Sequence, residues 1–204
     1  MIVIVCLMAA CAIGAYAQNP YAGITEDGWS VHVGYKGARP TILDFANAYL
    51  DDESVEFLGQ MRMALRQFKS NRPVSKGLLT VDSKNGYLSY EDTYDEGDER
   101  SSVEMCYWNC SDGKHKLFAV SQECYQNGKP IQTEFTGISF FLYNNATHNM
   151  TTVGMEDIGV AIETNNVVTF TLPQKGKNIV MKEYTDRGII SRKLIWDGYV
   201  FHLQ

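Results

Sequence analysis

The histidines and glycine-rich turns are the first candidates for catalysis in this chain, and their spacing matches no known catalytic motif. The four histidines are His32, His115, His148 and His202. The sequence contains neither a Gly-x-Ser-x-Gly nucleophile motif nor a His-Glu-x-x-His zinc motif. The Gly-Lys pairs at 113 and 176 lie in predicted turns without the following helix that binds phosphate. The sequence therefore predicts no catalytic residue, and an exported hydrolase with an unrecognised carboxylate or histidine site is the alternative.

The cysteines give no clear disulfide or metal site either. Three of them, Cys106, Cys110 and Cys124, follow the apolar amino-terminal segment, so at most one internal bridge can form. If Cys106 and Cys110 share a strand, their Cα atoms lie about 13 Å apart, whereas a disulfide needs less than about 7 Å. The three also lack the paired spacing of a zinc site. We expect buried, reduced cysteines, no metal and no cofactor, although a pairing among the three stays open.

Six carboxylates are concentrated between Glu91 and Glu99. Oxygen ligands of this kind suit calcium, but the spacing is not that of an Asp-x-Asp-x-Asp-Gly calcium loop. Charge runs usually form solvated loops. We expect such a loop here, and it is also the one candidate for the protruding loop of a secreted inhibitor of a lytic enzyme.

Aromatic side chains are the remaining candidates for a binding surface. The chain has 12 tyrosines and three tryptophans, and both residue types suit glycan and protein interfaces because each joins an apolar face to a polar tip. Tyr94, in the acidic segment, and Tyr125, beside a turn, are expected to be exposed. Trp108 and Trp196 lie in the middle of predicted strands and are either core residues or part of the same surface.

The amino terminus has the pattern of an export signal. Residues 1–17 carry no charge, and Ala15-Tyr16-Ala17 precedes Gln18, which predicts a signal peptide cleaved between Ala17 and Gln18. A lipid anchor on Cys11 is a less favoured alternative, and the apolar run is shorter than the ~20 residues that span a bilayer. We expect a periplasmic, cell-surface or secreted protein without stable membrane insertion. The net charge of -6 argues against a nucleic-acid partner.

Helical spacing is confined to residues 41–70. Thr41 and Asp44 have the spacing of a capping box at a helix start. Apolar residues then recur at intervals of three and four, which indicates one buried helix face. These residues are Val55, Leu58, Met61, Leu65 and Phe68. Arg72-Pro73 ends this helical region.

Residues 76–203 instead predict about nine or ten short antiparallel strands. Residues that tolerate positive φ separate the apolar runs. These turns are Asn85-Gly86, Asp112-Gly113, Asn127-Gly128, Asp186-Arg187-Gly188 and Asp197-Gly198. The order of strands and turns near 105–143 is repeated near 168–203, which predicts a degenerate internal duplication.

The two patterns together predict an α+β fold. The continuous apolar run from Phe140 to Tyr143 is typical of a strand covered on both faces. We expect residues 18–204 to form one domain, with the amino-terminal helices packed on a long antiparallel β-meander. A barrel or a two-sheet sandwich is the alternative.

Two segments of the carboxyl half resemble a group of bacterial proteins. They are Leu172-Pro-Gln-Lys-Gly-Lys-Asn-Ile179 and Leu194-Ile-Trp-Asp-Gly-Tyr-Val-Phe201. With the leader ending in Ala17-Gln18, they look like the secreted β-rich proteins with a domain of unknown function found in gut-type Gram-negative bacteria. The resemblance covers mainly the carboxyl half. It implies export and a β-rich body, and it carries over no catalytic residue.

These observations favour an exported, non-enzymatic protein that binds an unknown glycan or an envelope or host protein. If the ligand is a glycan, the protein from Gln18 to Gln204 should bind saturably to a glycan array. Replacing Tyr94 and Tyr125 together by Ala should then abolish the binding, because stacking on tyrosine rings would be lost. Absence of binding to any glycan would contradict this version.

Overall fold

The computed structural model describes residue 21 and residues 28–51, 58–93 and 99–204. The predicted signal peptide, its cleavage site at Ala17 and Gln18, Cys11 and Tyr94 lie outside the described residues. In chain order the elements are β1 Ser30–His32, α1 Ile42–Asp51, α2 Gly59–Lys69, β2 Leu78–Asp82, β3 Tyr87–Thr93, β4 Glu99–Asn109, β5 His115–Gln126, β6 Lys129–Ile131, β7 Gly137–Asn144, β8 Asn149–Val153, the 3₁₀ helix η2 Glu156–Ile158, β9 Val167–Thr171, β10 Ile179–Thr185, β11 Gly188–Trp196 and β12 Phe201–Leu203.

Helix α1 begins where the capping box predicts. The Asp44 carboxylate accepts hydrogen bonds from the Thr41 backbone N–H at 2.8 Å and from the Thr41 hydroxyl at 2.7 Å. These bonds fix the first turn by satisfying a backbone donor that the helix itself leaves unpaired. Ile42, Phe45 and Tyr49 are buried on one face of α1.

Helix α2 follows the predicted apolar spacing over most of its length. Met61 and Leu65 are buried, together with Ala64 between them. Phe68 differs from the prediction, because its side chain is 43% exposed. It lies in the last turn of α2, just before the chain turns back toward β2, so the buried face ends one turn earlier than the sequence spacing implies. Val55 lies outside the described residues.

The strands form two antiparallel sheets. The larger sheet has the order β1-β8-β7-β5-β4-β3-β2, with β6 paired to β5, and the smaller has the order β12-β11-β10-β9. Each predicted turn connects two neighbouring strands. The barrel alternative is wrong, because β1 and β2 are two open edges of the larger sheet. The stretches predicted to be duplicated lie in different sheets, 105–143 in the larger and 168–203 in the smaller, and the duplication itself stays a prediction.

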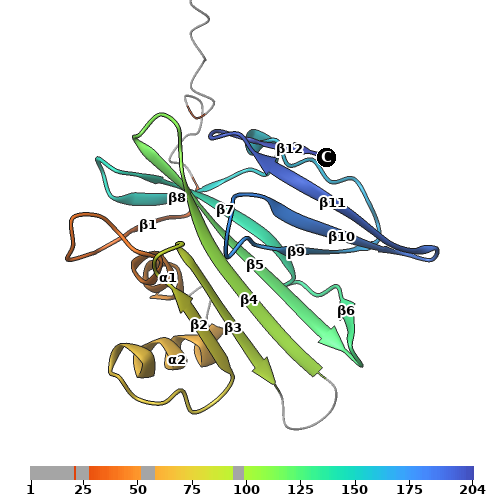
Figure 1. The fold of residues 1–204 in the computed structure, drawn as a ribbon, viewed down its shortest axis with the longest axis horizontal. Helices are drawn as coiled ribbons and strands as arrows, with labels where there is room; N and C mark the ends of the chain where they lie inside the picture. Colours follow the sequence, from red (N-terminus) through yellow and green to blue (C-terminus); the bar gives the residue numbers. More distant parts are fainter. Residues whose placement is uncertain (1–20, 22–27, 52–57, 94–98) are drawn as a thin grey trace, which may run out of the picture.

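The larger sheet is covered on both faces, by the helices on one side and by the smaller sheet on the other (Figure 1). The run from Phe140 to Tyr143 in β7 shows how this works. Phe141 and Tyr143 belong to the core beneath the helices, whereas Phe140 and Leu142 belong to the core between the sheets. The predicted two-sided burial of this strand is therefore confirmed, and the second cover is a β-sheet.

Two carboxylates attach the smaller sheet to the larger one. Glu104 of β4 accepts a hydrogen bond from the Leu172 backbone N–H at 2.6 Å, and Glu123 of β5 accepts one from the Phe170 N–H at 2.8 Å. The Ser121 hydroxyl donates to the Phe170 carbonyl at 2.7 Å. These backbone groups belong to β9 and to Leu172 directly after it, and β9 has a strand partner on one side only. Side chains of the larger sheet thus satisfy buried backbone groups that would otherwise be left without partners.

Burial raises the pKa of the Glu104 carboxyl, although the hydrogen bonds from the Leu172 N–H and the Tyr87 hydroxyl oppose the shift. A raised folded-state pKa means that the folded protein holds the proton more tightly than the unfolded chain does. The resulting stabilisation is complete below the ordinary pKa of 4.5 and is lost as the pH rises through the folded-state value.

We therefore expect Glu104→Gln to remove one component of the pH dependence of stability. The difference in free energy of unfolding, variant minus wild type, should increase as the pH rises above 4.5. Urea denaturation at a series of pH values between 4.5 and 7 measures this difference. Glu156→Gln, in the short helix η2, makes the same chemical change as a control. Parallel pH profiles for wild type and Glu104→Gln would contradict the expectation.

Candidate functional site

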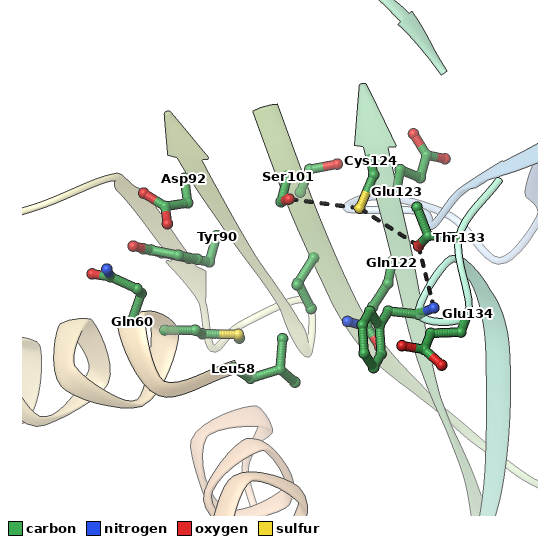
Figure 2. Close-up of a pocket in the computed structure, with 14 residues that line it drawn as sticks. Leu58, Gln60, Tyr90, Asp92, Ser101, Gln122, Glu123, Cys124, Thr133 and Glu134 are labelled. Atoms are coloured by element: carbon green, nitrogen blue, oxygen red, sulfur yellow. Dashed lines mark hydrogen bonds between the residues drawn. The ribbon is translucent and has the colours of Figure 1, made fainter. Parts of the chain in front are cut away.

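A pocket of about 540 Å³ opens between the start of α2 and the ends of three strands of the larger sheet (Figure 2). We call it the strand-end pocket. Its lining residues come from α2, β3, β4, β5 and the segment after β6. They are Leu58, Gln60, Met61, Tyr90, Asp92, Ser101, Ser102, Val103, Gln122, Glu123, Cys124, Thr133, Glu134 and Phe135.

Strand register builds the floor of this pocket in two rows. Asp92 pairs with Ser101, which pairs with Cys124. One step along the same face, Tyr90 pairs with Val103, which pairs with Gln122. Paired residues in antiparallel strands point to the same face, and residues two apart on one strand do so as well. The side chains of both rows are therefore neighbours on the helix-facing side of the sheet.

The pocket begins where the helices no longer cover the sheet. The next row on this face consists of Leu88, Met105 and Val120, and all three are buried in the core beneath the helices. Beyond that row the strands continue, and the helix cover ends at the start of α2. The N-cap residue Leu58 and the first-turn residues Gln60 and Met61 contribute to the pocket wall there. A hollow remains between the helix start and the strand ends.

Most of the wall is apolar. Leu58, Met61 and Val103 are buried, and Phe135 is an exposed aromatic side chain of the lining. Small-molecule sites are usually concave, mainly apolar and fitted with a few polar groups that orient the ligand. The strand-end pocket has this composition.

Asp92 is the polar group that stands out. It is only 4% exposed, and its Oδ1 atom is buried without a hydrogen-bond partner among the described residues. The Lys76 ammonium lies 4.0 Å from Oδ1, at the limit of an ion pair and beyond hydrogen-bond distance, and its side chain is 39% exposed. Burying a carboxylate without hydrogen bonds is costly, so an unsatisfied group of this kind needs an explanation.

Cys124 lies in the same row and is half-buried. Its sulfur is 3.6 Å from the Ser101 hydroxyl and accepts a long contact of 4.0 Å from the Thr133 hydroxyl, as Figure 2 shows. Among the described residues that line the pocket there is no histidine. The thiol therefore has hydroxyl neighbours and lacks the base that activates a catalytic cysteine.

The other two cysteines are buried and free, as expected from the sequence. Burial raises the pKa of the Cys110 thiol to about 11 and raises that of Cys106 as well. Cys124 is also free. Over the described parts of the chain, no group of three His, Cys, Asp or Glu side chains is arranged to hold a metal ion.

The tryptophans predicted as possible binding residues lie in the core between the sheets. Trp108 and Trp196 are each 5% exposed, and their ring centroids are 6.0 Å apart. The Trp108 indole N–H donates to the Lys177 carbonyl at 2.9 Å. Both rings therefore pack the two sheets together, and neither belongs to an exposed aromatic surface.

Tyr125 lies apart from the two tryptophans, since Trp108 pairs with Leu117 near one end of β5 and Tyr125 lies near the other end. Tyr125 of β5 is half-buried, its hydroxyl donates to Glu123, and the Arg100 guanidinium lies 4.3 Å from its ring centroid. Neighbouring residues of a strand point to opposite faces, so Tyr125 and the adjacent Cys124 of the pocket floor face away from each other. Tyr94 lies outside the described residues.

Two of the histidines pair with nearby turn carboxylates. His115 Nδ1 is 2.6 Å from an Asp112 carboxylate oxygen, and His202 Nε2 is 2.7 Å from one of Asp197. Each pair lies within or beside a single hairpin turn. These contacts are local and explain the two residues as stabilisers of turns.

Comparisons with protein-family models, with curated proteins and with solved structures found no match to this chain. Within the described residues no helix is both long enough and apolar enough to cross a bilayer.

Gly77 controls how the chain passes beside Tyr90 of the pocket floor. It has φ of +73°, and a Cβ there would lie 2.5 Å from the Tyr90 hydroxyl oxygen and 2.6 Å from the Glu91 carbonyl oxygen. The Tyr90 hydroxyl also donates to the Lys76 carbonyl at 3.3 Å. A side chain at position 77 would therefore force apart Tyr90 and the segment that carries Lys76.

We expect Gly77→Ala to lower the free energy of unfolding by about 2–4 kcal/mol, from left-handed backbone strain plus crowding. Gly113→Ala is a matched control, since Gly113 has φ of +66° and open space around its Cβ position. It should lower stability by only about 1–2 kcal/mol. Chemical denaturation compares the two, and equal losses would show that contact with Tyr90 imposes no extra cost.

Proposed function

We propose that this protein is an exported, non-enzymatic binding protein, and that its ligand is a small, largely apolar molecule held in the strand-end pocket. The single observation that carries the proposal is the combination of an apolar pocket wall with the buried carboxylate of Asp92, whose Oδ1 atom has no hydrogen-bond partner among the described residues. Apolar walls supply affinity through the water they release, and a buried polar group selects the orientation of the ligand. Export is supported by the uncharged leader and the small residues before Gln18.

The chemistry around the pocket supports binding more than hydrolysis. Burial raises the pKa of Tyr21, Cys106 and Tyr143, yet none of these three lines the pocket. Titratable groups with shifted pKa values usually converge at an active site. Some of the shifted groups are hydrogen-bonded to one another, as Tyr21 is to Cys110 and Tyr87 to Glu104, but none of these four lines the strand-end pocket. The described lining of the pocket contains no nucleophile that is hydrogen-bonded to a base.

The placement of the aromatic residues favours a small ligand over a glycan or protein bound on an aromatic surface. Trp108 and Trp196 are used in the core between the sheets. Tyr125 is already engaged by Glu123 and by the Arg100 guanidinium. The hypothesis of a secreted inhibitor of a lytic enzyme depended on the acidic segment from Glu91 to Glu99. Residues 94–98 of that segment lie outside the described residues.

Nile red, a neutral apolar dye that fluoresces when it leaves water, tests this function. We expect saturable binding with one site per chain. Ser101→Phe should raise the dissociation constant at least about tenfold, which corresponds to about 1.4 kcal/mol. Ser101 is the central residue of the floor row between Asp92 and Cys124, so a phenyl ring at this position occupies the space that the dye needs.

Ser191→Phe makes the same change on an exposed position of β11, in the smaller sheet, and should leave dye binding unaltered. Circular dichroism confirms that both variants fold. Absence of saturable dye binding to the wild type would contradict the proposal. Equal affinity of wild type and Ser101→Phe would place the dye elsewhere and contradict it as well.

A further inference from the structure

We propose that the natural ligand of the strand-end pocket is a cation, specifically an amine whose protonated nitrogen binds Asp92 and whose apolar body lies along the pocket wall. This inference rests on the proposed function and specifies its ligand class. It follows from the charges that line the pocket, from the position of Asp92 and from the neighbouring hydrogen-bond acceptors.

The ionisable side chains that line the pocket favour a positively charged ligand. Three lining residues are carboxylates, Asp92, Glu123 and Glu134, and the described lining contains no Lys, Arg or His. The Glu123 carboxylate points to the opposite face of the sheet from Cys124, where it accepts hydrogen bonds from the Phe170 N–H and the Tyr125 hydroxyl. Glu134 is exposed, where water screens its charge. Asp92 is therefore the carboxylate whose charge acts most strongly inside the pocket.

The surroundings of Asp92 leave room for a cation on the pocket side. Lys76, the cation 4.0 Å from Oδ1, is itself absent from the pocket lining, whereas Asp92 belongs to it. The carboxylate thus has an ammonium group at ion-pair distance outside the pocket and none among the residues that line it. A ligand ammonium within the pocket can supply the charged hydrogen bond that Oδ1 lacks among the described residues.

Neighbouring acceptors match the several N–H donors of an ammonium group. Ser101 is paired with Asp92 in the register of β3 and β4, so its hydroxyl lies next to the carboxylate on the same face. Gln60 lies on the same side of the pocket as Asp92 (Figure 2), and its amide oxygen is an acceptor. The apolar side chains of Leu58 and Met61 line the wall beside them. An amine with an aryl or alkyl body can place its ammonium group against the acceptors and its body against the apolar side chains.

Three probes of matched size separate charge from shape: 4-phenylbutylamine, 4-phenylbutan-1-ol and 4-phenylbutyrate. At pH 7 they are a cation, a neutral alcohol and an anion. Isothermal titration of the full chain with each probe should give the amine a dissociation constant at least about tenfold lower than that of the alcohol, with the carboxylate weakest. This comparison uses the wild-type protein and needs no variant to fold.

Asp92→Asn then tests which residue creates the preference. We expect the ratio of alcohol to amine dissociation constants to fall to within about twofold of one, while alcohol binding changes little, because the amide keeps the shape and loses the charge. Asp157→Asn makes the same change at an exposed residue of η2 outside the pocket lining, and should retain the preference for the amine.

The outcomes distinguish this inference from the proposed function. Equal affinity of the wild type for amine and alcohol, with both lost in Ser101→Phe, would leave the pocket as a binding site and overturn the cation. The same holds if Nile red binds and the amine does not. Retention of the amine preference in a folded Asp92→Asn variant also overturns the assignment. Absence of binding by Nile red and by all three probes would overturn the function and the inference together.

Discussion

The fold depends on the burial of its central strands on both faces at once. In β5 and β7 consecutive side chains point alternately to the core beneath the helices and to the core between the sheets. Burial of apolar surface is the main stabilising contribution to folding, so neither cover can be removed without exposing half of each strand. The helices and the smaller sheet are therefore both required. The fold accordingly has three layers, with the larger sheet between the helices and the smaller sheet.

The strand-end pocket is a direct result of unequal lengths in these layers. Strands β4 and β5 are the longest in the described structure, with 11 and 12 residues, whereas α1 and α2 have 10 and 11. A helix advances about 1.5 Å per residue and a strand about 3.3 Å. Helices of this length cannot cover the full length of these strands. The uncovered ends of the strands keep both apolar and polar side chains, and they form the floor of the pocket.

Local sequence patterns predicted much of the fold, but they did not predict the strand-end pocket. The capping pair Thr41 and Asp44, the turn dipeptides and the two-sided run at Phe140 each have a local physical cause, and each was found where predicted. A second sheet was expected only in the alternative of a two-sheet sandwich, and its position as the second cover was not predicted, because local patterns do not say which strands share a sheet. Trp108 and Trp196 were interpreted as possible surface residues for the same reason.

The pocket residues required knowledge of strand register. Asp92, Ser101 and Cys124 lie on three different strands and become neighbours only through the pairing of β3, β4 and β5. The one local signal was the alternation of Tyr90 with Asp92, which places an aromatic and an acidic side chain on one face of β3. That signal was obscured by the six carboxylates between Glu91 and Glu99, which made Asp92 look like part of a solvated loop.

The carboxylates of Glu104 and Glu123 also affect how separate molecules behave toward one another. A strand with one free side, such as β9, offers a row of backbone donors and acceptors that a foreign strand can extend. Side chains of the larger sheet occupy donors at Phe170 and Leu172 along that side. The attachment between the sheets therefore doubles as protection against self-association. The donors that these carboxylates occupy are withdrawn from pairing with a foreign strand at the β9 edge.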